Sequence, residues 1–270
     1  MIDPTKPAIE GAWPLVSLVM PVFNGMPWIP EAVDSVVGQA GVPWELIVMD
    51  GGSTDGTREW LTANPRPGMR VVMEPDKGQS DAIAKGLAQA RGSILGWLNA
   101  DDVLEPGALA AAAAVLAAHP EASMVSGVCL IIQADGAVTG RIEPPPDGSR
   151  AGLLRWPRNL AQPATLFTAA AFRASGGLDP ALHYAMDVDL WLKLARSGPA
   201  ILLRDQVLAR FREHQAAKSS RAATAMVREE LRVRLRHGLP PFSRAALTLV
   251  RWAYLRPAKH WLLARVRRGR

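Results

Sequence analysis

The chain has 270 residues, of which 49% are hydrophobic and 21% charged, a composition typical of a folded protein. The single cysteine, Cys129, excludes a disulfide framework and a cysteine-based zinc site and fits a reducing compartment. No stretch reaches the roughly 18 apolar residues of a membrane-spanning helix, and the polar N-terminus lacks the apolar segment of a signal peptide, so we expect a cytoplasmic protein.

The net charge of +6 is distributed unevenly along the chain. Residues 219–270 carry 13 basic and two acidic residues, which gives this segment +11 and leaves residues 1–218 at −5. We therefore divide the chain into a catalytic or binding body, residues 1–218, and a basic tail, residues 219–270. The acidic body argues against nucleic acid as a partner.

Apolar segments alternate with helical patterns through the first half of the chain. Strands are expected at Leu15–Met20, Trp44–Met49, Arg70–Met73, Ser93–Leu98 and Ser123–Ile132. Helices are expected at Pro27–Gln39, Thr54–Ala63 with a cap at Ser53, Ser80–Ala90 and Glu105–Ala118. This order predicts an α/β fold with a mostly parallel, twisted sheet flanked by helices, in which ligands bind beyond the carboxyl ends of the strands.

The second half is less regular. Turn sequences mark residues 133–162, and helical patterns return at Ala169–Ser175 and Asp187–Ser197. After Ser219 the sequence predicts a basic helical extension that is interrupted by prolines.

Two adjacent carboxylates, Asp101 and Asp102, follow the apolar segment Ile94–Leu98. Adjacent carboxylates repel each other, and burial raises the cost of ionising both, so we expect a positive charge at this strand end. The simpler alternative is a cap for the helix that begins near Glu105, although one carboxylate suffices for a cap.

Polar motifs recur at the ends of the other predicted strands. In chain order they read VSLVMPVFNG, ELIVMDGGSTDGT, DKGQSDAIAKGLAQARGSILGWLNADD and GGLDPALHYAMDVDLWLKLARSG, followed by FREHQAAKSS. Together, from about Leu15 to Ser219, they resemble glycosyltransferase family 2. The resemblance implies a GT-A fold and transfer of a sugar from a nucleotide-diphosphate-sugar donor.

The resemblance also implies a set of donor-binding residues. Asp50 stands where the family binds the base and ribose, and the alternative is that it serves only the Gly51-Gly52 turn. Lys85 is equally well explained as a residue of a solvated helix face. The full donor set that we expect is Pro21, Val22, Phe23, Asp50, Asp76, Lys85, Asn99 and Asp101.

A divalent cation, Mn²⁺ or Mg²⁺, is implied for the donor diphosphate, where it would act as a Lewis acid. Asp102 is the first choice of ligand, because many relatives carry a further aspartate where this chain has Asn99. His214 resembles the histidine that completes metal or diphosphate binding. The alternative for His214 is a plain surface residue.

An inverting transfer requires a carboxylate that takes the proton of the acceptor hydroxyl. The resemblance points to Asp187, with Asp189 as the competitor that would otherwise cap the helix. Met186 stands where the family often has glutamate.

The sequence therefore favours an inverting glycosyltransferase that acts on a surface-polysaccharide or lipid-linked saccharide acceptor. One alternative is a nucleotidyltransferase, although the first strand lacks a glycine-rich phosphate loop. Another is a catalytically silent protein that binds nucleotide-sugars or carbohydrates.

The tail spaces apolar residues among arginines, a pattern typical of helices that lie on anionic membrane surfaces. We expect it to place the protein on the inner face of the membrane, and the alternative is a helix packed on the body. The apolar residues are Leu247, Val250, Trp252, Leu255, Trp261 and Leu262.

Overall fold

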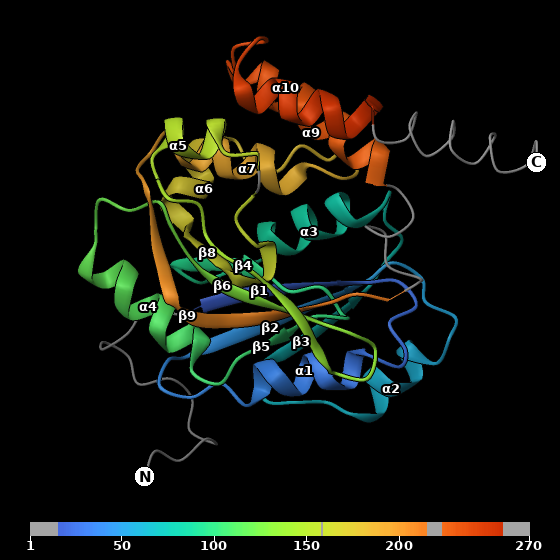
Figure 1. The fold of residues 1–270 in the computed structure, drawn as a ribbon. Helices are drawn as coiled ribbons and strands as arrows, with labels where there is room; N and C mark the ends of the chain where they lie inside the picture. The colour runs from blue at the N-terminus through green and yellow to red at the C-terminus, as the bar shows by residue number, and fades with distance from the viewer. Residues whose placement is uncertain (1–15, 158, 215–222, 256–270) are drawn as a thin grey trace, which may run out of the picture.

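The computed structural model describes residues 16–157, 159–214 and 223–255, which form one sheet with helices on both faces (Figure 1). The strand order is β3-β2-β1-β4-β8-β6-β9-β5, and β7 pairs with β6 beside this path. The strands are β1 (Val16–Val22), β2 (Trp44–Asp50), β3 (Met69–Met73), β4 (Ile94–Trp97), β5 (Val103–Leu104), β6 (Met124–Ile132), β7 (Val138–Ile142), β8 (Thr165–Thr168) and β9 (Ala200–Arg212).

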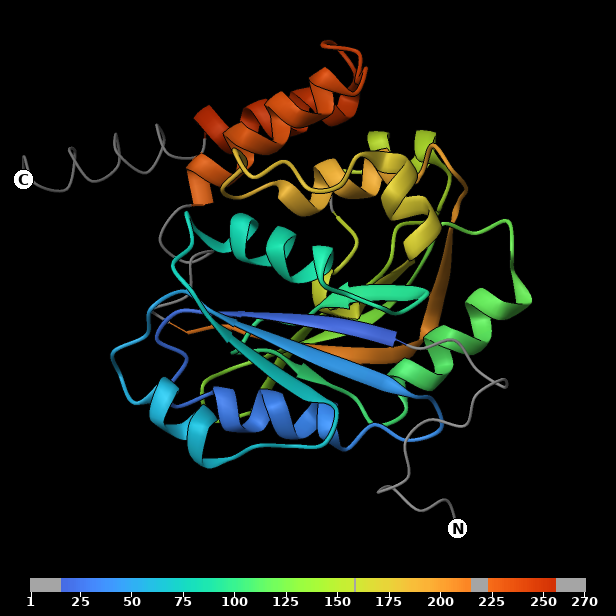
Figure 2. The same ribbon diagram turned by 180° about the vertical axis from the view of Figure 1, so that it is seen from behind.

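The helices lie in layers on the two faces of this sheet. Helices α1, α2 and α4 cover one face, while α3, α5, α6 and α7 cover the other (Figures 1 and 2). Their bounds are α1 (Ile29–Val37), α2 (Thr57–Ala63), α3 (Gln79–Ala88), α4 (Ala108–Ala118), α5 (Arg150–Arg155), α6 (Ala169–Ser175) and α7 (Met186–Leu194), with a 3₁₀ turn at Gln162–Ala164.

The N-terminal half of the sheet is parallel. Strand β1 pairs with β2 and β4, and β2 pairs with β3, all in the same direction. Successive side chains of β1 point to opposite faces, so Leu18 and Met20 join the core under α1, while Val19 joins the core under α3. The expected α/β class, a twisted sheet flanked by helices, is confirmed.

The second half of the sheet is mixed. Strand β8 runs antiparallel to both of its neighbours, β4 and β6, and β6 pairs in parallel with the 13-residue β9. Sequence patterns did not predict β5, β7, β8 or β9. Strands β5 and β8 have two and four residues, and β9 is half-exposed along much of its length, so neither length nor apolar alternation marks them.

One predicted helix start is wrong. Helix α2 begins at Thr57 after Gly56, which has a φ of 96°, and not at Thr54 after a Ser53 cap. Ser53 instead accepts a hydrogen bond from the backbone N–H of Asn24, 2.8 Å away. Its hydroxyl therefore joins the ends of β1 and β2.

The C-terminal segment packs on the body where it is described. Helix α9 (Ala223–Arg236) lies against α7, helix α10 (Arg244–Val250) lies against α9, and a π-helical turn follows at Arg251–Leu255. Apolar residues of this segment, including Leu231, Val233 and Leu249, belong to the same core as α7. Residues 219–222 and 256–270, which include Trp261 and Leu262, lie outside the described residues. Among the described helices, none combines the length and the apolarity needed to cross a membrane.

A close approach between α3 and β1 requires a glycine. A β-carbon on Gly86 would lie 2.5 Å from Cγ1 of the fully buried Val19. Replacing glycine by alanine within a helix normally stabilises it by about 1 kcal/mol. We expect Gly86→Ala instead to lower the free energy of unfolding by about 1–3 kcal/mol, because the core is overpacked. Urea unfolding measures the change, and a stabilised variant would contradict the packing described.

Candidate functional site

The carboxyl ends of β1, β2 and β4 meet at one edge of the sheet. Val22 pairs with Asp50 across β1 and β2, and the backbone N–H of Leu98, just after β4, donates to the carbonyl of Val19. The residues that follow these three strands are therefore brought together, as parallel strands require.

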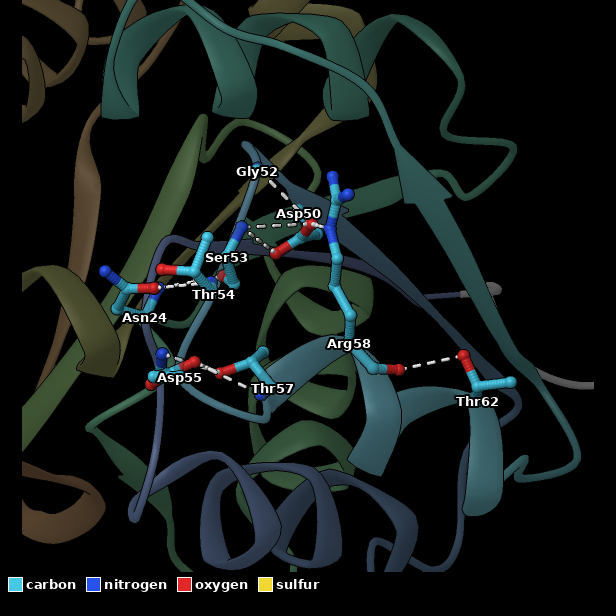
Figure 3. Close-up of polar contacts among 10 residues, drawn as sticks. Asn24, Asp50, Gly52, Ser53, Thr54, Asp55, Thr57, Arg58 and Thr62 are labelled. Atoms are coloured by element: carbon cyan, nitrogen blue, oxygen red, sulfur yellow. Dashed lines mark hydrogen bonds and ion pairs between the residues drawn. The ribbon is translucent and has the colours of Figure 1, made fainter.

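Asp50 is a buried carboxylate at the end of β2. It accepts hydrogen bonds from the backbone N–H groups of Gly52 and Ser53 and forms an ion pair with Arg58 of α2 (Figure 3). Burial raises the pKa of Asp50, but the hydrogen bonds from Ser53 and Arg58 outweigh burial and leave the pKa below its usual value. Asp50 is thus an ionised acceptor, and the sequence did not point to Arg58 as its partner.

The end of β1 borders Asp50. Pro21 and Val22 are buried, whereas the Phe23 side chain is 67% exposed. Asn24 has a φ of 56°, and its side-chain oxygen accepts a hydrogen bond from the Thr54 N–H, as Figure 3 shows. This bond joins the residues that follow β1 to the turn that follows β2.

Asp76 lies against the same turn. A β-carbon on Gly51 would lie 2.1 Å from Oδ2 of Asp76, so only glycine fits beside this carboxylate. Lys85 lies on the side of α3, where its ammonium group contacts the Pro75 carbonyl at 2.9 Å and the Asp81 carboxylate at 3.1 Å. These contacts account for Lys85 without a ligand, and its donor role stays a prediction.

The two carboxylates after β4 differ in their surroundings. Asp102 is completely buried, and its two oxygens accept hydrogen bonds from Nδ2 of Asn99 at 2.9 Å and the backbone N–H of Arg212 at 3.0 Å. Burial and the neighbouring Asp101 charge raise the pKa of Asp102 well above its usual value. The pair does not cap α4, which begins after Gly107 without a side-chain cap.

Asp101 is the more accessible member of the pair. Its side chain is 31% exposed, and Oδ2 lies 3.0 Å from Nε2 of His214, which follows β9. Residues 113 positions apart in the sequence thus place a carboxylate and an imidazole side by side at the surface.

Arg212 is a buried cation at this end of the sheet, and no pattern in the sequence indicated its role. Its guanidinium donates to the Asp101 carbonyl at 3.0 Å and to the Glu31 carboxylate at 2.6 Å. The same group lies 4.6 Å from the ring centre of Trp28, at a distance suited to a cation–π contact. The positive charge expected beside the acidic pair is therefore supplied in part by the protein.

Amide side chains join the acidic pair to α3. Asn99 Oδ1 accepts a hydrogen bond from Gln79 at 2.7 Å, and Gln162 donates to the Trp97 carbonyl at 2.6 Å. The next residue of α3, Ser80, donates to the Leu182 carbonyl in the loop before α7. Helix α3 thus connects the end of β4 with the region that carries Asp187.

Asp187 lies half-buried in the first turn of α7. Its Oδ1 accepts a hydrogen bond from the backbone N–H of Val188 at 2.8 Å. The pKa of Asp187 is raised to about 7, mainly by burial and to a smaller extent by the nearby Glu230 carboxylate of α9, while the hydrogen bond from Val188 and the Arg234 guanidinium act to lower it. A carboxyl group with this pKa can accept a proton near neutral pH.

Asp189 is held in a different way. It is buried between His237, whose Nε2 lies 2.8 Å from Oδ1, and Lys193, whose ammonium nitrogen lies 2.7 Å from Oδ2. Burial acts to raise the pKa of Asp189, but these two partners lower it overall. Asp189 is not the cap of α7, because it lies within the helix and joins α7 to the segment after α9.

The sequence is similar to a known protein family and to proteins of known name. The sequence model described as Glycosyl transferase family 2 matches residues 17–174. A chondroitin synthase from Pasteurella multocida is 29% identical over 189 residues, which cover 68% of this chain and 19% of that protein. The matched part is thus about a fifth of the length of that relative.

Solved structures share the fold. TarS from S. aureus in complex with UDP-GlcNAc superimposes with a TM-score of 0.63 at 19% identity, over 82% of this chain and 66% of that chain. The mannosyltransferase PcManGT from Pyrobaculum calidifontis, in complex with GDP-Man and Mn²⁺, gives a TM-score of 0.61 at 25% identity, over 97% of this chain and 74% of that chain.

Proposed function

The chain belongs to glycosyltransferase family 2, and from this premise we propose that it is an inverting transferase that uses a nucleotide-diphosphate-sugar donor and a surface-polysaccharide or lipid-linked saccharide acceptor. The observation that carries the proposal is the separation of roles among its carboxylates. Asp50 has a lowered pKa and suits recognition, whereas Asp187 has a pKa of about 7 and suits proton transfer.

The nucleotide is proposed to bind at the ends of β1 and β2. Asp50 can accept a hydrogen bond from an N–H of the base, and the exposed ring of Phe23 offers it an apolar surface. Asp76, packed against Gly51, borders the turn after β2, and in this proposal Asn99 and Asp101 face the diphosphate. Similar structures with UDP-GlcNAc and with GDP-Man support a nucleotide-sugar donor.

A divalent cation fits Asp101 and His214. Carboxylate and imidazole groups are suitable ligands for Mn²⁺, and the two side chains are close and partly accessible. Within the described part of the chain, no cluster of three or more His, Cys, Asp or Glu side chains could hold an ion alone. Donor phosphate oxygens would complete the coordination, as is common for such ions. When bound, the ion supplies positive charge to the leaving diphosphate.

We propose Asp101 rather than Asp102 as the carboxylate ligand. Both oxygens of Asp102, the ligand expected from the sequence, are engaged in the interior by Asn99 and Arg212. In this proposal Asp102 holds the strand end, and His214 keeps its expected role.

The transfer step is proposed to use Asp187 as the general base. The acceptor hydroxyl oxygen forms a bond to the anomeric carbon from the face opposite the diphosphate, and Asp187 takes the hydroxyl proton. The bond between the anomeric carbon and the diphosphate oxygen breaks, and its electron pair leaves with the nucleoside diphosphate. One displacement of this kind inverts the anomeric configuration.

The alternatives have less support. A nucleotidyltransferase is disfavoured by family membership, and a silent binding protein would not require a base with a pKa near neutrality. The relative that is a chondroitin synthase supports a saccharide acceptor.

The C-terminal segment is proposed to contact an anionic membrane surface. Phe242, just before α10, is 88% exposed, and Leu247, on α10, is 54% exposed. Arg244 and Arg251 are also exposed and are close to them in the sequence. This exposed face would act together with residues 256–270, although α9 and the buried side of α10 pack on the body.

The metal assignment predicts a difference between neighbouring carboxylates. We expect Asp101→Asn and His214→Ala to weaken Mn²⁺-dependent UDP or GDP binding at least tenfold, because each removes a ligand. Asp102→Asn should mainly lower thermal stability. Titration calorimetry with and without Mn²⁺ measures binding. If a folded Asp102→Asn variant lost metal-dependent binding and Asp101→Asn kept it, Asp102 would be the ligand.

The base assignment predicts a loss of turnover without a loss of donor affinity. Asp187→Asn cannot accept a proton, so turnover of UDP-GlcNAc or GDP-mannose, whichever the parent uses, should fall about 100-fold or more. Asp189→Asn is the matched comparison and should mainly destabilise the fold, because it breaks a buried ion pair. The roles are exchanged if only Asp189→Asn shows the selective loss of turnover.

The pH dependence follows from the protonation state of the base. Because Asp187 must be ionised to act, turnover should rise as pH increases through about 7. Glu230 and Arg234 are the charged groups that act on the pKa of Asp187. Glu230→Gln removes a negative charge that raises this pKa, so the rise of turnover should occur at lower pH in that variant. A pH–rate profile without a limb in this range would contradict the assignment.

The membrane proposal predicts dependence on charge and on two apolar side chains. Binding to phosphatidylglycerol vesicles should exceed binding to phosphatidylcholine vesicles and weaken above about 0.15 M salt, where the Debye length is near 8 Å. The double variant Phe242→Ser, Leu247→Ser should bind less, whereas Val138→Ser, an exposed residue of β7, should bind like the parent. Equal flotation with both lipids would rule out the electrostatic contact.

A further inference from the structure

The loop before α7 is held by a carboxylate from the C-terminal segment. Glu229 of α9 accepts hydrogen bonds from three consecutive backbone N–H groups, those of His183 at 3.1 Å, Tyr184 at 2.5 Å and Ala185 at 2.8 Å. The Glu229 residue is only 9% exposed. A single buried carboxylate therefore satisfies the amides that lead into the N-terminus of α7.

This contact is electrostatically favourable. Backbone N–H groups at a helix N-terminus carry partial positive charge and have no partner within the helix. Hydrogen bonds to an ionised acceptor are about twice as strong as neutral ones. Of the three donors, Ala185 is the N-cap residue of α7, and His183 and Tyr184 precede it, so Glu229 anchors the segment that leads into α7 from 44 to 46 positions farther along the chain.

Helix α9 is itself anchored, so Glu229 has a fixed position. Arg234 is fully buried and lies five residues after Glu229 on α9. Its guanidinium donates to the carbonyls of Leu153 and Leu154 at 2.7 and 2.9 Å. It also donates to Glu230 at 2.7 Å. Arg234 therefore ties α9 to the end of α5, on the same face of the sheet as α7.

Asp187 is only two residues beyond Ala185, the last residue that Glu229 holds. On the other side of the loop, Ser80 of α3 donates to the Leu182 carbonyl. The segment 182–185 is thus held from both sides, by α3 next to the donor region and by α9.

We propose that Glu229 is a positioning residue that fixes the loop 183–185 and so places Asp187 for proton transfer. The inference rests on the proposed role of Asp187 as the base. It assigns to the C-terminal segment a part in the reaction, in addition to any contact with a membrane. A displacement of about 1 Å in a catalytic group can lower a rate about 100-fold, so the loss of this carboxylate should be measurable in turnover.

The test compares Glu229→Ala and Glu229→Gln with Arg232→Ala, an exposed residue of the same helix. The assays are turnover of UDP-GlcNAc or GDP-mannose with Mn²⁺, whichever the parent uses, and amide hydrogen exchange of the peptide that spans residues 180–190. We expect Glu229→Ala to lower kcat about 10- to 100-fold with KM for the donor changed less than twofold, and to speed exchange in this peptide. Glu229→Gln, which keeps one acceptor oxygen, should lie between Glu229→Ala and the parent, and Arg232→Ala should match the parent.

Two outcomes separate this inference from the proposed function. If Asp187→Asn kept parental turnover, the proposed base would be wrong whatever Glu229 does. If Asp187→Asn were inactive while folded Glu229→Ala kept parental kcat and exchange, only the positioning role would be overturned. Should Glu229→Ala not fold, Glu229→Gln decides, and parental kcat together with parental exchange in that variant would overturn the inference.

Discussion

The structure depends on concentrating carboxylates at one side of a sheet without leaving their charges uncompensated. A buried ionised carboxylate without a partner costs several kcal/mol. Each carboxylate here interacts with a different partner. Asp50 forms an ion pair with Arg58, and Asp101 lies beside the His214 imidazole. Asp102 accepts hydrogen bonds from the Asn99 side chain and the Arg212 backbone. Asp187 accepts a hydrogen bond from the Val188 N–H, and burial raises its pKa to about 7. The chemical roles follow from these differences.

Arg212 links this arrangement to the rest of the fold. Its buried guanidinium contacts the Asp101 carbonyl, the Glu31 carboxylate and the Trp28 ring, so it joins the end of β9 to the acidic pair and to α1. His214 is two residues farther along the chain. The Arg212 contacts therefore hold the end of β9 from which His214 reaches Asp101.

The C-terminal segment has a comparable structural part. The charge pattern divided the chain into a body and a basic tail, and α9 carries the buried groups Glu229, Arg234 and the adjacent His237 of that tail into the body. Helix α9 has the exposed arginines Arg232 and Arg236 on its outer side and the buried Arg234–Glu230 ion pair on its inner side. The described part of this segment belongs to the same core as α7.

The sequence predicted the features that depend on local patterns. Apolar segments that end in Asp50 and in Asn99–Asp102 indicated parallel strands with a polar edge, and both residue groups lie there. The partners of these residues could not be predicted in the same way, because Asp102 contacts Arg212 across 110 positions and Glu229 contacts Ala185 across 44. The difference between Asp101 and Asp102 is one of burial, which depends on how β9 packs and not on the motif itself.

The most direct measurement is the position of Mn²⁺ in crystals grown with Mn²⁺ and UDP or GDP, located by anomalous diffraction. We expect one strong peak that contacts the Asp101 carboxylate, Nε2 of His214 and the nucleotide diphosphate. A peak bound to Asp102, or a diphosphate bound away from the ends of β1, β2 and β4, would contradict it.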